Sequence, residues 1–343
     1  MSVTDPHIKA TKQGALGLLT LDRPKALNAL THGMITAIAD SLAGWAADDS
    51  VKAVAIKGEG ERAFCSGGDI RAVQQSIVAG SDAGASLLRD EYRMNALIGA
   101  YPKPYIAMVH GITMGGGAGV SIHGSHRPAD SSLMFAMPET GIGFIPDVGS
   151  SYFLSRLPDR LGLYLGLTAN SIGLGDAMAA GLVTHAVARS DFDAIIAALA
   201  DGQAAEKTIV PFARKPEAGP LAAHRSRIAT VFAGSSVEAI LERLDRDGSD
   251  FAIATAQIMR TRSPTSLKLV FRQLHEAETL SLNQCLAMEF RLALRVLPRH
   301  DFREGVRAAL VDKDRRPKWE PSSLAGVADL GDFFGKLGSE ELF

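Results

Sequence analysis

The stretch His110-Gly111-Ile112-Thr113-Met114-Gly115-Gly116-Gly117 ends a strand expected at residues 105–110 and predicts a sharp glycine-rich turn. A second stretch, Ala63-Phe64-Cys65-Ser66-Gly67-Gly68-Asp69, also follows a strand-like segment and opens a helical pattern near residue 70. Turns between a strand and a helix leave backbone N–H groups unpaired, and glycine lets a ligand approach them closely. One such turn is equally well explained by tight packing of a helix on a sheet. Two of them favour a site that holds a single anionic oxygen.

Strand and helix patterns alternate through the first 190 residues, which predicts an α/β fold with a largely parallel sheet. We expect strands at residues 15–21, 51–57, 105–110, 132–135 and 182–188. We expect helices at residues 31–46, 85–100, 150–157, 160–165 and 172–180. Thr31 stands where a side chain caps a helix N-terminus.

Strand signals become rare after residue 190, and a proline-containing linker is expected at residues 207–220. Helical patterns follow at residues 236–245, 251–260, 267–280 and 282–297. We therefore expect two parts: residues 1–190, which carry the site, and residues 191–343, a mainly helical region that packs on them.

The composition is that of an ordinary globular protein, with 343 residues, 46% hydrophobic and 22% charged. The formal net charge of −2 shows no basic excess for nucleic acid or an anionic membrane, so neither partner is expected. Residues 105–122 are apolar enough to imitate a membrane span, but His110 and five glycines favour a strand, a turn and a helix instead.

The two cysteines, Cys65 and Cys285, are too few for a disulfide framework or a four-cysteine zinc site. The N-terminus shows no signal-peptide pattern, so we expect a reducing, cytoplasmic location. Cys65 lies in a glycine-rich turn and is a candidate nucleophile, although a buried structural thiol is the better interpretation.

Several motifs typical of other enzyme classes are incomplete or absent in this sequence. Residues 58–63 (GEGERA) loosely fit the dinucleotide-binding pattern, but a turn follows them instead of a long helix. No G-x-x-x-x-G-K-[ST], G-x-S-x-G or H-E-x-x-H motif is present. His123 and His126 lack a further ligand cluster nearby. We expect no metal and no separate cofactor.

Residues 137–149 place two carboxylates, Glu139 and Asp147, in an otherwise apolar and glycine-rich stretch. A carboxylate in apolar surroundings is costly unless it is paired or used, and burial raises its pKa toward the range of acid–base catalysis. Without the two glycine-rich turns, solvent exposure or helix capping would explain both residues. Glu91 lies among other charges, and its pattern alone indicates a solvated helix face.

These segments resemble the crotonase superfamily, which includes enoyl-CoA hydratases and isomerases. Residues 21–30 (LDRPKALNAL) match its usual opening. The 3-hydroxyisobutyryl-CoA hydrolase branch is the closer match, through residues 110–117, 135–140, 146–149, 263–268, 301–308, 313–314 and 317–319. The resemblance runs from about residue 15 to 321 and is weakest across 190–262. It implies a crotonase-like spiral of β-β-α turns with a helical C-terminal region.

The resemblance also implies a site in which the amides of Ser66 and Gly116 bind the thioester carbonyl of an acyl-CoA. Glu139 and Asp147 form the catalytic pair of the hydrolase branch. Gly119 stands where hydratases carry their first glutamate. The substrate-binding residues implied are Glu91, Gly67, Gly68, Asp69, Gly115 and Lys25. For the CoA phosphates, the candidate cations are Lys25, Arg71 and Lys268.

The expected reaction is hydrolysis of a short 3-hydroxyacyl-CoA, foremost 3-hydroxyisobutyryl-CoA in valine catabolism, with coenzyme A as part of the substrate. Glu139 acts either as nucleophile or as general base on a water, and the sequence leaves this open. Two alternatives remain: an enoyl-CoA hydratase or isomerase, and a non-catalytic acyl-CoA-binding relative. The family also implies a homo-oligomer, a trimer or a dimer of trimers.

Overall fold

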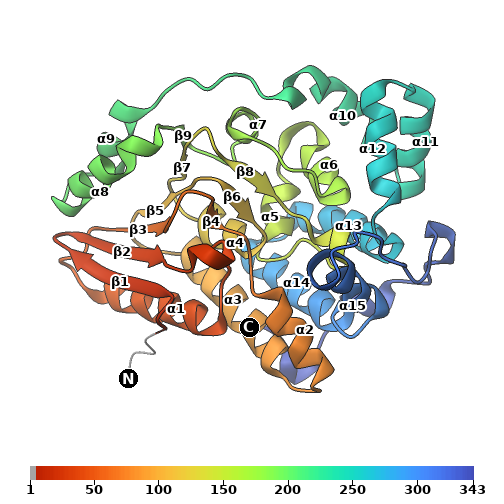
Figure 1. Ribbon diagram of the computed structural model, residues 1–343, viewed down its shortest axis with the longest axis horizontal. Coiled ribbons are helices and arrows are strands. Elements are labelled where there is room, and N and C mark those ends of the chain that lie inside the picture. The colour runs from red at the N-terminus through yellow and green to blue at the C-terminus, as the bar shows by residue number, and fades with distance from the viewer. Residues whose placement is uncertain (1–4) are drawn as a thin grey trace. The chain divides into compact units, whose positions relative to one another are not determined.

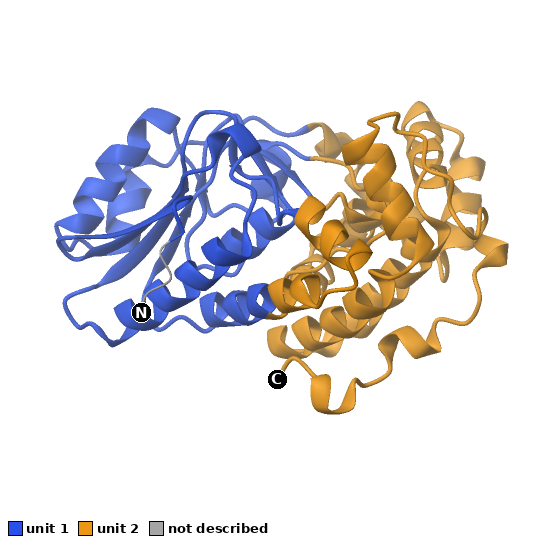
Figure 2. Ribbon diagram, turned by 60° about the horizontal axis from the view of Figure 1, so that its bottom comes forward, with its two compact units in different colours: residues 1–69, 90–136, 172–219 blue, residues 70–89, 137–171, 220–343 orange. Residues whose placement is uncertain are grey.

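The computed structural model describes residues 5–343, which group into two compact units (Figure 2). Unit 1 comprises the chain up to residue 69 with residues 90–136 and 172–219, and unit 2 comprises residues 70–89, 137–171 and 220–343. The predicted division near residue 190 stays a prediction, because these units follow contacts in space and each gathers three segments of the chain.

The nine strands found within residues 5–343 all belong to unit 1 (Figure 1). They are β1 (Ile8–Gln13), β2 (Leu16–Leu21), β3 (Ala53–Gly58), β4 (Ala63–Cys65), β5 (Tyr105–Met108), β6 (Ile112–Met114), β7 (Pro128–Ala129), β8 (Met134–Ala136) and β9 (His185–Ala186). Its helices are α1 (His32–Ala47), the C-terminal part of α3 (Ala83–Gly99), α4 (Gly116–Ile122), α7 (Leu174–Ala179), α8 (Phe192–Ala200) and α9 (Ala205–Ile209).

The strands form three sheets, ordered β1-β2-β3-β5, β4-β6-β8 and β7-β9. In the described part of the chain, β1 and β2 pair antiparallel, and the other strand pairs are parallel. Along the chain β3 enters the first sheet and β4 the second, and after two helices β5 and β6 repeat this division before α4. This repetition of strand, strand and helix confirms the predicted α/β fold with β-β-α turns.

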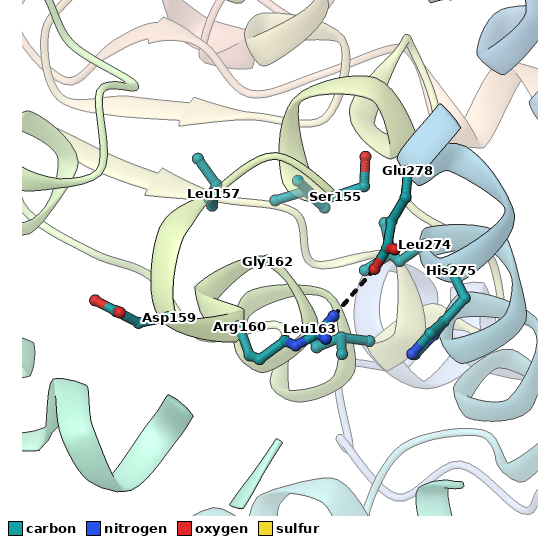
Figure 3. A pocket seen from close by; sticks show the side chains of 10 residues that line it. Ser155, Leu157, Asp159, Arg160, Gly162, Leu163, Leu274, His275 and Glu278 are labelled. Atoms are coloured by element: carbon teal, nitrogen blue, oxygen red, sulfur yellow. Dashed lines mark hydrogen bonds and ion pairs between the residues drawn. The ribbon is translucent and has the colours of Figure 1, made fainter. Parts of the chain in front are cut away.

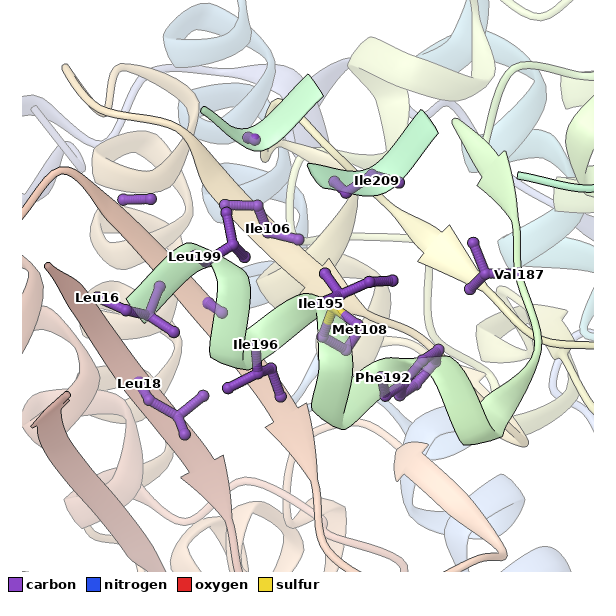
Figure 4. Close-up of a cluster of buried hydrophobic side chains, with 13 residues drawn as sticks. Leu16, Leu18, Ile106, Met108, Val187, Phe192, Ile195, Ile196, Leu199 and Ile209 are labelled. Atoms are coloured by element: carbon purple, nitrogen blue, oxygen red, sulfur yellow. The ribbon is translucent and has the colours of Figure 1, made fainter. Parts of the chain in front are cut away.

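Helix α8 closes the apolar face of the first sheet in unit 1 (Figure 4). Strand β2 is buried along its whole length, as expected for strands covered on both faces. The helix and the strands share one core, which consists of Leu16, Leu18, Ala53, Ala55, Ile106, Met108, Val187, Phe192, Ile195, Ile196, Leu199, Ala205 and Ile209. The N-terminal strands therefore depend on residues about 180 positions later for their cover.

Unit 2 is helical, which confirms the predicted helical character of the C-terminal region. Its helices are α2 (Ile70–Val78), the start of α3, α5 (Ser150–Leu154), α6 (Leu161–Thr168), α10 (Arg225–Val231), α11 (Val237–Asp247), α12 (Asp250–Arg260), α13 (Pro264–Glu276), α14 (Leu282–Val296), α15 (His300–Val306) and α16 (Gly331–Phe334). Serine hydroxyls accept from the backbone at the N-termini of four of them, namely Ser236, Ser249, Ser263 and Ser281.

Most predicted elements are present, but the short strands β4, β6 and β7 were not predicted as strands. Strand β1 was not predicted, and the strand expected at residues 182–188 is reduced to His185–Ala186. The predicted cap is confirmed, because the Thr31 hydroxyl accepts from the Met34 N–H at 3.1 Å. Among residues 5–343, no helix is long and apolar enough to cross a membrane.

Candidate functional site

The loop at residues 22–30 is the scaffold of the first glycine-rich turn in unit 1. Asn28 is fully buried, and its amide donates to the carbonyls of Glu59 at 3.0 Å and Ala63 at 2.9 Å. The same side chain accepts from the Arg23 N–H at 3.0 Å. Asn28 adopts a left-handed backbone (φ 55°), which asparagine tolerates better than most residues. This single side chain therefore fixes the loop against the β3–β4 connection.

The scaffold loop and the turn Ser66–Asp69 are joined by backbone hydrogen bonds. The Ser66 N–H donates to the Leu27 carbonyl at 3.0 Å, and the Leu30 N–H donates to the Gly67 carbonyl at 2.8 Å. The Asp69 carboxylate pairs with the Arg23 guanidinium at 2.9 Å. Of the predicted residues in this turn, Ser66 and Asp69 thus have structural partners inside unit 1.

The two glycine-rich turns meet at Gly68 and Gly116. A Cβ on Gly116 would stand 3.1 Å from the Gly68 nitrogen and 2.4 Å from Oε1 of Glu91. A Cβ on Gly68 would stand 3.7 Å from Oε2 of the same carboxylate. Glu91 is buried, so the prediction of a solvated face from pattern alone is wrong, and its carboxylate lies beside both turns. A side chain at position 116 would therefore displace the Glu91 carboxylate or the neighbouring backbone.

The thiol of Cys65 lies beneath these turns. It is fully buried, and burial raises its pKa to about 12, with the nearby Glu91 charge adding to the effect. A thiol of this kind stays protonated at neutral pH, and the thiolate is the nucleophilic form. The interpretation of Cys65 as a structural thiol is therefore favoured over a catalytic one.

Unit 2 carries Glu139 and Asp147, and each side chain is only 6% exposed. Glu139 begins the short 3-10 helix η2 (Glu139–Ile142), and its carbonyl accepts from the Phe144 N–H at 3.0 Å. Asp147 lies in the connection before α5, and its carbonyl accepts from the Ser150 N–H at 2.9 Å. Both predicted carboxylates are thus buried within one short segment of the chain.

Another buried carboxylate of unit 2, Glu289 on α14, was not predicted from the sequence. Its carboxyl accepts from the Gly149 N–H at 2.6 Å and from the N–H and hydroxyl of Ser151 at 2.8 and 2.5 Å. Burial raises the pKa of Glu289 to about 8, and the charge of Asp147 raises it further against the lowering effect of those hydrogen bonds. In the sequence this residue is one charge on an amphipathic helix, which ordinarily indicates a solvated position.

The candidate cations for the CoA phosphates differ in their surroundings. Arg71 donates to the Leu310 carbonyl at 2.5 Å, and Lys268 pairs with Glu238 at 2.8 Å. Lys25 is exposed on the short 3-10 helix η1 (Pro24–Ala26). Among the three, Lys25 is the cation whose side chain forms no hydrogen bond or ion pair within residues 5–343.

Three cavities in the described part of the chain have volumes of about 170, 320 and 310 Å³. The first lies in unit 2 beside the ion pair between Arg160 and Glu278, whose nitrogen and oxygen are 3.0 Å apart (Figure 3). None of the three is lined by a predicted site residue. Across residues 5–343, no group of three or more His, Cys, Asp or Glu side chains is arranged to hold a metal ion.

Comparison with known proteins agrees with this geometry. The enoyl-CoA hydratase/isomerase family model matches residues 16–331. The chain belongs to the enoyl-CoA hydratase/isomerase family. Within the family, a protein of Xenopus tropicalis named 3-hydroxyisobutyryl-CoA hydrolase, mitochondrial, is 44% identical over 353 aligned positions, covering 99% of this chain and 92% of that protein.

Two further relatives support the assignment to this family. A Danio rerio protein of the same name is 45% identical over 347 aligned positions, covering 96% of this chain and 90% of that protein. A crystal structure described as a carnitinyl-CoA dehydratase from Mycobacterium thermoresistibile has a TM-score of 0.94 and 41% identity, with 99% of both chains covered. The resemblance stated from sequence motifs is thereby confirmed, although the names of these relatives differ in the reaction.

The prediction of a cytoplasmic location is wrong, because the curated relatives are named as mitochondrial proteins. That prediction rested on the lack of a signal-peptide pattern, and the two cysteines, which are both free and buried, add little to it. Free thiols indicate reducing surroundings, but they do not distinguish one reducing compartment from another.

Proposed function

We propose that this family member hydrolyses 3-hydroxyisobutyryl-CoA to 3-hydroxyisobutyrate and coenzyme A, a step of valine catabolism. The observation that carries this is the alignment of nearly the whole chain, at 44% and 45% identity, with relatives named for that hydrolase. One water is consumed, and the bond between the acyl carbon and sulfur is broken. Coenzyme A enters as part of the substrate, and the reaction needs no separate cofactor.

The thioester oxygen binds to the backbone N–H groups of Gly68 and Gly116, which together form the oxyanion hole. The close approach of these two glycines supports this choice. Ser66 was predicted in place of Gly68, but its N–H already donates to the Leu27 carbonyl at 3.0 Å. Ser66 then contributes by shaping the turn. Such donors stabilise the charge that develops as the thioester carbon is attacked.

Glu139 and Asp147 supply the acid–base chemistry, and Glu91 contacts the substrate. Their burial supports these roles, because a buried carboxylate is costly unless it is paired or used. Glu139 either attacks the acyl carbon or deprotonates the attacking water, and Asp147 orients the water or protonates the leaving thiolate. Gly119, buried on α4, offers no side chain for the first glutamate of a hydratase, which favours hydrolysis over hydration.

The decisive assay is release of free thiol from 3-hydroxyisobutyryl-CoA by the purified protein. Glu139→Gln and Asp147→Asn should each lower kcat at least about 100-fold while the protein still binds CoA thioesters. Glu242→Gln, at an exposed position on α11, is the matched control and should keep full activity. Hydration of crotonyl-CoA without thiol release would establish the hydratase alternative, and binding without turnover would establish the non-catalytic one.

Two finer points belong to the same proposal. Preference for 3-hydroxyisobutyryl-CoA over 3-hydroxypropionyl-CoA depends on one methyl group, worth about 1–3 kcal/mol in an apolar pocket. Comparing kcat/KM for the two thioesters measures it directly. A homo-oligomer, as a trimer or a dimer of trimers, follows from the family, and light scattering of the purified protein tests it.

A further inference from the structure

The turn that carries Asp147 has a strained backbone. Val148, the next residue, adopts a left-handed conformation (φ 55°), and Gly149 follows it with φ 82°. A β-branched residue with a positive φ is a genuine outlier, because its side chain crowds the backbone. Val148 is also buried, so it cannot relax into solvent. Such a conformation persists only where the surrounding structure holds it, and outliers of this kind gather at functional sites.

Glu289 holds this turn on its C-terminal side. Its carboxyl accepts three hydrogen bonds, from the Gly149 N–H and from the N–H and hydroxyl of Ser151. The N-cap position of α5 is Gly149, which has no side chain to cap the helix itself. A carboxyl from α14 therefore provides the acceptors that the first turn of α5 needs, two residues after Asp147.

Gln273 holds the same turn on its N-terminal side. This residue of α13 is fully buried, and its amide nitrogen donates to the Pro146 carbonyl at 2.7 Å. Asp147 thus lies between two anchored backbone groups, the carbonyl of Pro146 and the N–H of Gly149. Both anchors are polar side chains from helices that start more than 110 residues further along the chain.

We propose that Glu289 is a positioning residue, which holds the strained turn Asp147–Gly149 and thereby fixes the orientation of the Asp147 carboxylate for thioester hydrolysis. The kinetic consequence rests on the proposed function. Three charged or titratable groups surround the Glu289 carboxyl or its neighbours: Asp147, Cys285 one turn earlier on α14, and Arg156 near Cys285. The Asp147 charge contributes to the raised pKa of Glu289, so the two carboxyls influence each other electrostatically.

A purely structural role for Glu289 predicts different behaviour. If Glu289 only stabilised α5, its replacement would lower the stability of the protein and add its effect to any other variant. If it acts through Asp147, its effect on kcat disappears once Asp147 has lost its carboxylate, since residues that act as a unit are not additive.

The kinetic test is a double-mutant cycle with Glu289→Gln and Asp147→Asn. The glutamine oxygen can still accept from Ser151, but its NH₂ group faces the Gly149 N–H, so one hydrogen bond is lost. Glu289→Gln should lower kcat about 10-fold and change KM less than about twofold. The same change in the Asp147→Asn background should lower kcat no further. An unchanged kcat in the single variant, or a full 10-fold loss in the double variant, would overturn the inference.

A second measurement needs no substrate and so separates this inference from the proposed function. The rate of hydrogen exchange at the backbone amides of Gly149 and Ser151 reports directly on their hydrogen bonds to Glu289. Glu289→Gln should speed exchange in residues 147–151 about 10-fold, and the exposed control Glu242→Gln should not. If Glu289→Gln is poorly folded, Ser151→Ala removes one of the three hydrogen bonds and should produce a smaller increase at the same amides. Unchanged exchange in both variants contradicts the inference, even if the enzyme proves to act on another thioester.

Discussion

The glycine-rich turns of unit 1 and the carboxylate segment of unit 2 would contribute different chemical groups to the proposed reaction. The first presents backbone N–H groups, which never titrate, and its geometry depends on the absence of a Cβ at Gly116. The second presents the buried side chains of Glu139 and Asp147, and a third buried carboxyl holds the backbone beside them. The first region should therefore be sensitive to volume, and the second to charge and pH.

Gly116→Ala tests the sensitivity to volume and has the largest expected effect. A Cβ at this position would lie 2.4 Å from Oε1 of Glu91, so the Gly116 amide or the carboxylate must move. Loss of one oxyanion donor typically lowers kcat about 10²–10³-fold, and we expect a loss of that size in the thiol-release assay. A Gly116→Ala enzyme with native kcat would show that the turn is not built around this close approach.

Gly44→Ala is the matched control for that substitution. Gly44 is exposed on α1, and a Cβ there would meet no atom within 4 Å. Alanine favours the helix by about 1 kcal/mol relative to glycine. The variant should therefore keep native activity and unfold at a slightly higher urea concentration.

The pH dependence of stability tests the sensitivity to charge in unit 2. Burial raises the pKa of Glu289 from 4.5 to about 8, so the folded protein binds this proton more tightly than the unfolded chain does. The stabilisation that folding gains from the Glu289 proton is complete below pH 4.5 and is lost as the pH rises through 8. The Glu289→Gln variant does not lose stability in this way as the pH rises. The difference between its free energy of unfolding and that of the native protein should therefore rise by ~1–3 kcal/mol between pH 5 and 8.

Urea unfolding of both proteins at several pH values measures this difference. We also expect a constant difference in the free energy of unfolding at every pH, because glutamine lacks one of the three hydrogen bonds. A difference that does not change with pH would mean that Glu289 ionises as it does in the unfolded chain.

Treatment of the two cysteines with a thiol reagent has the smallest expected effect. Cys65 lies in unit 1 and Cys285 in unit 2. Burial raises the pKa of Cys65 to about 12 and that of Cys285 to about 11, so neither thiol ionises near neutral pH. Iodoacetamide should therefore leave the folded protein unmodified and fully active, while both thiols react in urea. An adduct on folded protein, detected by mass spectrometry, would contradict the assignment of both thiols as structural.

Local patterns predicted much of the fold, and they failed where tertiary contacts decide. The helix at α1 could be predicted because Thr31 caps it and apolar residues recur along one side. Strand β1 could not, because it is an edge strand with five of its six residues exposed and thus lacks a hydrophobic alternation. Helix α8 has four buried residues with helical spacing, at positions 192, 195, 196 and 199, and the prediction overlooked that signal.

The sequence could propose residue types for the candidate site, but not the contacts of its individual atoms. The two glycine turns and the pair Glu139 and Asp147 follow from the motifs and the resemblance. The partner of the Ser66 N–H does not, because Leu27 is far from it in sequence and its contact depends on the folded loop. The contacts of Glu289 could not be predicted either, since its three hydrogen-bond donors lie about 140 residues earlier in the chain.

The position of α8 has a consequence for biosynthesis. Its side chains cover Leu16 and Leu18 on β2, which leave the ribosome about 180 residues before it. Pairings between such distant segments form late, and an uncovered apolar sheet face is prone to aggregate in the meantime. We expect nascent chains that stop before residue 192 to bind a hydrophobic dye and a holdase chaperone, and chains that extend past residue 209 to bind neither. Equal binding by both lengths would show that the sheet finds another cover during synthesis.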